Sequence, residues 1–179
     1  MNKGFYCICL LILAMSAQAQ QTLPWLSIQQ TSGHFVQQKH LKVLSRPFVS
    51  KGSYHYDKAT GLSWHTEEPV ANQLLINAQG IVEIQADGSQ KTVTSDTSVG
   101  NLLLALFSGD QTLLSEQFSL TQTDDGVSMH PQTALLKKLF SHIDICQKES
   151  QSQQISLFEA DGNRTDIKLI PDQQTDTTD

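Results

Sequence analysis

Residues 50–66, SKGSYHYDKATGLSWHT, carry the clearest structural signal in the chain. Tyr54 and Tyr56 fall on one face of an alternating run, and Leu62 and Trp64 alternate in the same way after a short turn that ends in Gly61. Because a short turn between two alternating runs joins antiparallel neighbours, this stretch predicts a β-hairpin with one apolar face. The fold is therefore expected to be built on an antiparallel sheet.

Similar alternating runs lie on both sides of this hairpin. They predict strands at 35–44, 73–78, 81–86, 118–123, 127–130, 143–147, 155–160 and 165–170. A sheet of about nine strong strands has to twist and curl. We therefore expect a strongly curved antiparallel sheet with an apolar concave side.

Three segments in the second half of the chain change to helical periodicity. The first is expected to run to Phe107 behind possible N-caps at Ser95 or Asp96, with Gly109 as its stop, and its apolar stripe consists of Val99, Leu102, Leu103, Leu106 and Phe107. A second short helix is expected at 110–117 and a third at 133–140, with one stripe made of Leu135, Leu136, Leu139 and Phe140. Helices set between runs of strands indicate an α+β fold with the helices on one face of the sheet.

Residues 1–19 predict a secretory signal peptide. Lys3 precedes an apolar run at 5–15, which is shorter than the roughly 20 residues of a membrane-spanning helix. Ala17 and Ala19 supply the small residues for cleavage after Ala19, and an uncleaved anchor is the alternative. The mature chain is then expected to form a single domain over 20–170, followed by a disordered acidic tail at 171–179.

The charge balance excludes one class of partner. The chain has 12 basic and 18 acidic residues and a net charge of -6, whereas nucleic-acid binding depends on basic patches. The same net charge argues against electrostatic attraction to anionic lipid head groups. Cys146 is the single cysteine after removal of the signal peptide, so it is expected to be either a reactive thiol or a small half-buried strand residue.

Catalytic motifs are absent from the mature sequence. It contains no G-x-S-x-G elbow, H-E-x-x-H pair, C-x-x-C pair, Walker loop or G-x-G-x-x-G turn. His55, His65 and Glu67 could form a metal site across the first hairpin, but strand positions of this kind commonly face solvent. We therefore expect no metal, no cofactor and no enzymatic activity, and a hydrolase assembled from distant strands is the alternative.

Three short segments suggest a family. Phe35-Val36-Gln37, then Gly52-Ser53-Tyr54, then Leu62-Ser63-Trp64 with Pro69 soon after, resemble the opening of the periplasmic lipoprotein carriers of the LolA type. The order of elements is similar over most of the mature chain. The resemblance implies an unclosed β-barrel with a lid of short helices and an apolar cavity. It also implies a periplasmic, monomeric carrier that moves an acylated lipoprotein or other lipid from an inner-membrane donor to an outer-membrane acceptor.

The resemblance also assigns site residues. Those expected to line the cavity and lid are Tyr54, Trp64, Leu102, Leu103, Leu106, Phe107, Leu135, Leu136, Leu139 and Phe140. At the lid-latch position in the first turn, the family places an arginine followed by proline, whereas this chain has Lys58 and Ala59. A lysine cannot make the forked contacts of a guanidinium, so the chain is expected to be a divergent carrier that serves another lipid. The alternatives are that the helical stripes are ordinary core, or that the fold serves a protein- or peptide-binding envelope sensor.

Overall fold

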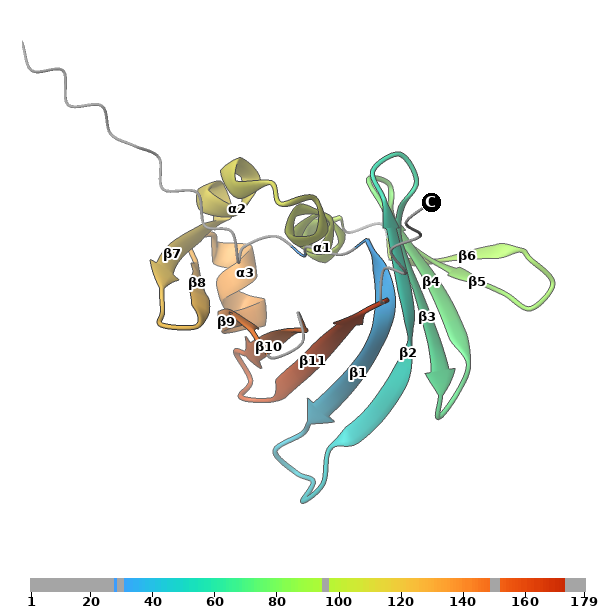
Figure 1. The fold of residues 1–179 in the computed structure, drawn as a ribbon, viewed down its shortest axis with the longest axis horizontal. Helices are drawn as coiled ribbons and strands as arrows, with labels where there is room; N and C mark the ends of the chain where they lie inside the picture. The colour runs from blue at the N-terminus through green and yellow to red at the C-terminus, as the bar shows by residue number, and fades with distance from the viewer. Residues whose placement is uncertain (1–27, 29–30, 95–96, 149–151, 173–179) are drawn as a thin grey trace, which may run out of the picture.

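Eleven strands form one antiparallel sheet in the computed structural model, which describes residues 28, 31–94, 97–148 and 152–172 (Figure 1). The strands are β1 (Ser32–His40), β2 (Phe48–Asp57), β3 (Gly61–Glu68), β4 (Asn72–Asn77), β5 (Gly80–Ile84), β6 (Gln90–Thr94), β7 (Phe118–Gln122), β8 (Gly126–Pro131), β9 (Phe140–Gln147), β10 (Gln153–Glu159) and β11 (Arg164–Pro171). The expected signal peptide, the N-caps Ser95 and Asp96 and most of the expected tail lie outside the described residues.

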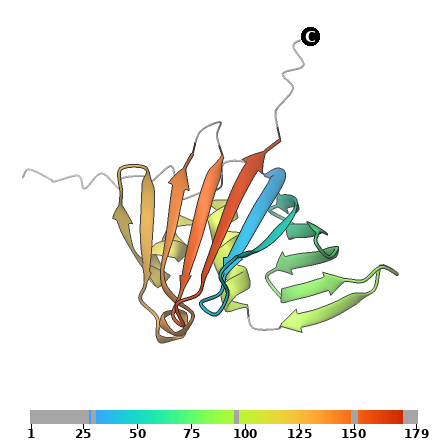
Figure 2. The same cartoon turned by 90° about the horizontal axis from the view of Figure 1, so that it is seen from below.

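The strand order explains why the sheet is open. β1 pairs with β11 near the middle of the sheet, hairpins extend the sheet on both sides, and β6 and β7 form the two edges. The chain has to pass from one edge to the other between β6 and β7, and helices α1 (Ser98–Ser108) and α2 (Gln111–Gln117) make this connection across one face (Figures 1 and 2). The third described helix, α3 (Ala134–Leu139), lies between β8 and β9.

The α+β class and the unclosed antiparallel architecture are confirmed, although the sheet is not strongly curled. Since β6 and β7 do not pair with each other, the helices bridge the gap that a further strand pairing would close in a complete barrel. None of the helices in the described ranges is long and apolar enough to cross a membrane.

Local sequence sets the ends of the helices. Gly109 ends α1 in the left-handed conformation, with φ 67°, which glycine adopts at little steric cost. The Asp110 carboxylate accepts a hydrogen bond from the Leu113 amide at 2.9 Å, and the Thr133 hydroxyl accepts one from the Leu136 amide at 3.3 Å. These side chains satisfy amide groups that have no partner within a first helical turn.

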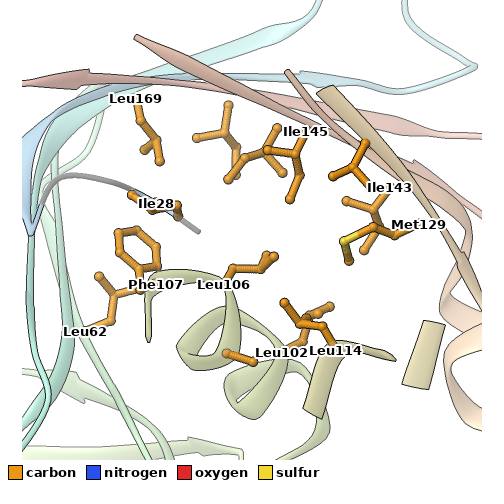
Figure 3. Packing of buried hydrophobic residues seen from close by; sticks show 14 of the residues in the cluster. Ile28, Leu62, Leu102, Leu106, Phe107, Leu114, Met129, Ile143, Ile145 and Leu169 are labelled. Carbon is orange, nitrogen blue, oxygen red and sulfur yellow. The ribbon is translucent and has the colours of Figure 1, made fainter. Parts of the chain in front are cut away.

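The core lies between the helices and the inner face of the sheet (Figure 3). Leu62 on β3 and Leu106 on α1 are both fully buried there. Helix α1 packs over β4 and β5 at Gly100, where a Cβ atom would lie 3.4 Å from Cγ2 of Ile76, at ordinary contact distance. The inner face of the sheet is therefore apolar where the helices cover it.

Several predicted boundaries are wrong. β1 ends at His40, so residues 41–47 form a loop and not the end of a strand. β6 was not predicted, because its sequence QKTVT lacks an alternating apolar pattern and an edge strand needs only backbone pairing. The third helix ends at Leu139, and Phe140 begins β9 by pairing with Glu159.

The shorter α3 also corrects the predicted stripe on that helix. Leu136 is buried, but the exposed fractions of Leu135 and Leu139 are 46% and 37%. A helix of six residues presents one narrow side to the core, and Leu136 occupies that side. Leu135 and Leu139 are four residues apart and so lie together on a side that faces solvent.

Candidate functional site

Aromatic side chains gather where α1 crosses the inner face of β1, β2 and β3. The rings of Phe35 and Trp64 stack with centroids 3.9 Å apart. Phe107 of α1 packs edge-on against Tyr54 at 5.5 Å and lies 5.7 Å from Tyr56. Tyr54 and Trp64, both predicted from the hairpin pattern, are thus brought together with the first helix.

The predicted stripe of α1 faces the same group of residues. Leu102, Leu106 and Phe107 are buried, and Leu103 is partly buried against the cluster. Of the residues predicted on the third helical segment, Leu136 belongs to the core cluster and Phe140 packs against it from the start of β9. Leu135 and Leu139 are largely turned away from it.

Burial also changes the chemistry of Tyr54. Loss of water around the phenol raises the pKa of Tyr54 to about 12, and the negative charge of Asp172 adds to this effect. The hydroxyl therefore stays protonated even at pH values where an exposed phenol, with a pKa of 10.0, would ionise. The inner face beneath α1 consequently carries no charge from this residue.

The inner face becomes polar at the end that adjoins the loop at 41–47. The side chain of Lys39 forms an ion pair with Glu159, and the Thr165 hydroxyl donates a hydrogen bond to the same carboxylate at 3.1 Å. Lys39 and Phe35 lie on the same face of β1 because they are four residues apart in a strand. The face is thus apolar under the helices and charged at one end.

Lys58, the residue predicted at the lid-latch position, lies in the tight turn between β2 and β3. The Asp57 carboxylate accepts hydrogen bonds from the Thr60 and Ala59 amides, and these bonds lower the pKa of Asp57. Lys58 is exposed, and it has no hydrogen bond or ion pair with the described residues. The turn is therefore defined by the hydrogen bonds to Asp57, and the Lys58 side chain extends into solvent.

The histidines considered for a metal site lie on the opposite, outer face of the sheet. His34, His55 and His65 line a shallow hollow of about 270 Å³, and the imidazole of His34 lies 3.7 Å from the Asp172 carboxylate. Glu67 accepts a hydrogen bond from Ser53 at 3.2 Å. In the described part of the chain, no group of three or more His, Cys, Asp or Glu side chains is placed to hold a metal ion.

Cys146 is half-buried on the outer side of β9. Its neighbour Lys148 has a raised pKa, first because of a hydrogen bond with the thiol and then because of a second one to Asp125, 3.3 Å away. This contact was not predicted, because one lysine after Cys146 does not form a group of basic residues in the sequence. The thiol of Cys146 therefore lies beside a lysine that is itself bound to a carboxylate, in a polar environment.

The sequence also missed several contributors to the apolar site. Ile28 is buried in the core, and its amide donates a hydrogen bond to the Leu106 carbonyl at 3.0 Å (Figure 3). It lies before the first strand, where no periodic pattern exists. Phe35 and Tyr56 belong to predicted strands, so their alternation could have included them among the site residues.

The fold and the site together define a class of protein. An open antiparallel sheet whose apolar inner face is covered by helices running between its free edges is an unclosed β-barrel with a helical lid. The chain belongs to the LolA family of outer membrane lipoprotein carrier proteins, whose family model matches residues 27–179. Carriers of this family are periplasmic and non-enzymatic. No curated protein matches the chain.

Proposed function

We propose that the protein carries acyl chains of a lipoprotein or another lipid between the inner face of its sheet and its helices. It would receive the lipid from an inner-membrane donor and deliver it, as a monomer, to an outer-membrane acceptor. The observation that supports this proposal is that short helices cover the apolar inner face of the sheet and connect its two free edges. Movement of these helices would not require any strand pairing to break.

The free-energy cost of moving α1 away from the sheet is comparable to the free energy gained when an acyl chain is buried there. This balance suits a reversible carrier. Exposing Leu102, Leu106 and Phe107 would cost roughly 5–9 kcal/mol, at about 1.5–3 kcal/mol for each buried side chain. An acyl chain of about fifteen methylenes gains on the order of 12 kcal/mol gross when it leaves water. Loss of ligand freedom removes several kcal/mol of that gain, so binding stays reversible.

The distribution of polar groups suggests how the lipid would lie. Its chain would occupy the apolar region that Tyr54, Trp64 and Leu103 border, after α1 moves away from the sheet. The Lys39–Glu159 pair stands at the end of the same face and would lie nearer to the polar part of the cargo. Leu135 and Leu139, which are exposed in the closed form, would offer apolar contact at the lid.

The experiment that tests the proposal is mass analysis of lipids extracted from protein purified from its native periplasm. We expect an acylated species bound to the protein. A bound peptide without an acyl group would favour the sensor alternative, and protein free of any lipid after mild purification would contradict the carrier function.

A further inference from the structure

The loop at 41–47 and the ends of the two strands that flank it form an exposed tip. This β1–β2 tip projects past the neighbouring hairpins at the foot of Figure 1. It carries four large apolar side chains in water: the exposed fractions are 88% for Val43, 62% for Phe48, 45% for Leu44 and 43% for Val49. Apolar side chains gathered at a protruding position mark an interaction surface more often than scattered ones do.

The tip is held in place and is not a loosely attached loop. The Leu44 amide donates a hydrogen bond to the Leu41 carbonyl at 2.9 Å, which closes a turn within the loop. The Lys42 amide donates one to the Asn163 side chain at 3.1 Å, in the turn between β10 and β11. The aliphatic part of Lys42 passes over Gly162, where a Cβ atom would lie 2.1 Å from Cε of the lysine.

The charge of the tip is opposite to that of the whole protein. The chain has a net charge of -6, yet its first acidic residue is Asp57, so neither β1 nor the tip contains a carboxylate. Lys39 and Lys51 are paired with Glu159 and Glu68.

Two further cations on the tip lack such partners. Lys42 and Arg46 are exposed, and no carboxylate among the described residues lies within ion-pair distance of either. Neither cation is therefore held in an ion pair at the place where the apolar side chains are exposed. Their positive charge would orient the tip toward an anionic surface, although the rest of the molecule is repelled by one.

We propose that the β1–β2 tip docks the protein onto an anionic phospholipid membrane. Lys42 and Arg46 contact the negative head groups, and Val43, Leu44 and Phe48 enter the boundary between head groups and acyl chains. Apolar side chains beside lysine and arginine are the combination that binds such an interface. The proposal differs from the expectation drawn from net charge, because net charge averages over a surface on which the charges are unevenly placed. The proposal does not rest on the carrier function, because it needs no lipid inside the fold.

The test is flotation of the purified mature protein with vesicles of phosphatidylethanolamine and phosphatidylglycerol, compared with vesicles of phosphatidylcholine alone. We expect association with the anionic vesicles that weakens as salt is added. Replacing both cations, Lys42→Gln with Arg46→Gln, should weaken partitioning about thirty-fold, since each cation near such a surface contributes about 1 kcal/mol. The double variant Val43→Ser and Phe48→Ser should weaken partitioning at least about ten-fold. Its remaining association should still weaken as salt is added.

The matched control is Lys91→Gln with Val93→Ser, which removes one exposed cation and one exposed apolar side chain from the edge strand β6. We expect it to bind vesicles like the unmodified protein, and circular dichroism should show that all variants are folded. Absence of wild-type binding to anionic vesicles would overturn the proposal and point to a protein partner for the tip. An equal loss in the control pair would overturn it as well, because the effect would then not belong to this hairpin.

Discussion

At the scale of single residues, Tyr54 links the packing of the site to a measurable titration. Its folded-state pKa is about 12 against an ordinary value of 10.0, so the unfolded chain loses this proton first as the pH rises. The contribution of Tyr54 to stability is therefore complete below pH 10.0 and declines until the pH passes about 12.

Tyr54→Phe should remove this part of the alkaline loss of stability. The measurement is the free energy of unfolding in urea across the same pH range, together with phenolate absorbance of the folded protein. Tyr56→Phe, on the same face of β2, is the matched control. An absorbance change near pH 12 that is still present in Tyr54→Phe would show that the phenol with the raised pKa belongs to another tyrosine.

Lys58→Arg tests whether the turn between β2 and β3 can hold α1 in place. Tyr56 contacts Phe107, so the turn that holds Lys58 starts close to the C-terminal end of α1. The guanidinium of Lys58→Arg offers five donors to the end of α1, whereas the lysine has no partner among the described residues. We expect a higher unfolding midpoint for the lipid-free protein and slower uptake of a fluorescent fatty acid. Lys91→Arg on β6 is the control, and a Lys58→Arg protein with both quantities unchanged would exclude a latch at this turn.

At the level of secondary-structure elements, α3 contains one leucine that stabilises the core and another that is exposed to solvent, although the sequence pattern placed both on one apolar stripe. Leu136 is buried, so Leu136→Glu places a charge in the core and should lower the unfolding midpoint steeply, beyond the roughly 2–5 kcal/mol of a Leu→Ala change. Leu139 is 37% exposed, so Leu139→Glu should leave the midpoint nearly unchanged and still reduce binding of a fluorescent fatty acid. Normal binding by a stable Leu139→Glu protein would remove this residue from the lid.

The same elements show what the sequence could and could not predict. Hairpins with alternating apolar residues were predicted because burial on one face of a strand imposes a period of two. β6 was missed because Val93 is the one large apolar residue among its five, so the strand has no alternating apolar pattern, and its position is set by pairing with β5. The end of α3 was misplaced because the pairing of Phe140 with Glu159 joins positions far apart in the sequence, and no local pattern reports such pairing.

At the scale of the whole molecule, the pairing of β1 with β11 places the sheet edges at the two strands that flank the helices. As a result, the helices that cover the sheet connect its two edge strands. The pattern of apolar residues within single strands does not predict this connection. The same arrangement separates the apolar inner face from a basic tip on an otherwise acidic protein. Periodicity in the sequence predicted Tyr54, Trp64 and the α1 stripe as site residues. The uneven distribution of charge over the surface could be recognised only from the folded structure.

The proposed carrier function requires an acyl chain to enter between α1 and the sheet, and a disulfide that locks this helix in place would test this requirement. A Cβ atom at Gly100 would lie 3.8 Å from Cγ1 of Ile81 on β5, close enough for Gly100→Cys and Ile81→Cys to form a bond after a small shift. Cys146→Ser removes the other cysteine of the mature chain.

The measurement is uptake of a fluorescent fatty acid by this variant, before and after reduction of the disulfide. We expect the oxidised protein to bind at least about ten-fold more weakly than the same protein after reduction, because the closed helix occupies the space of the ligand. Equal uptake in both forms would contradict the claim that the acyl chain lies beneath α1.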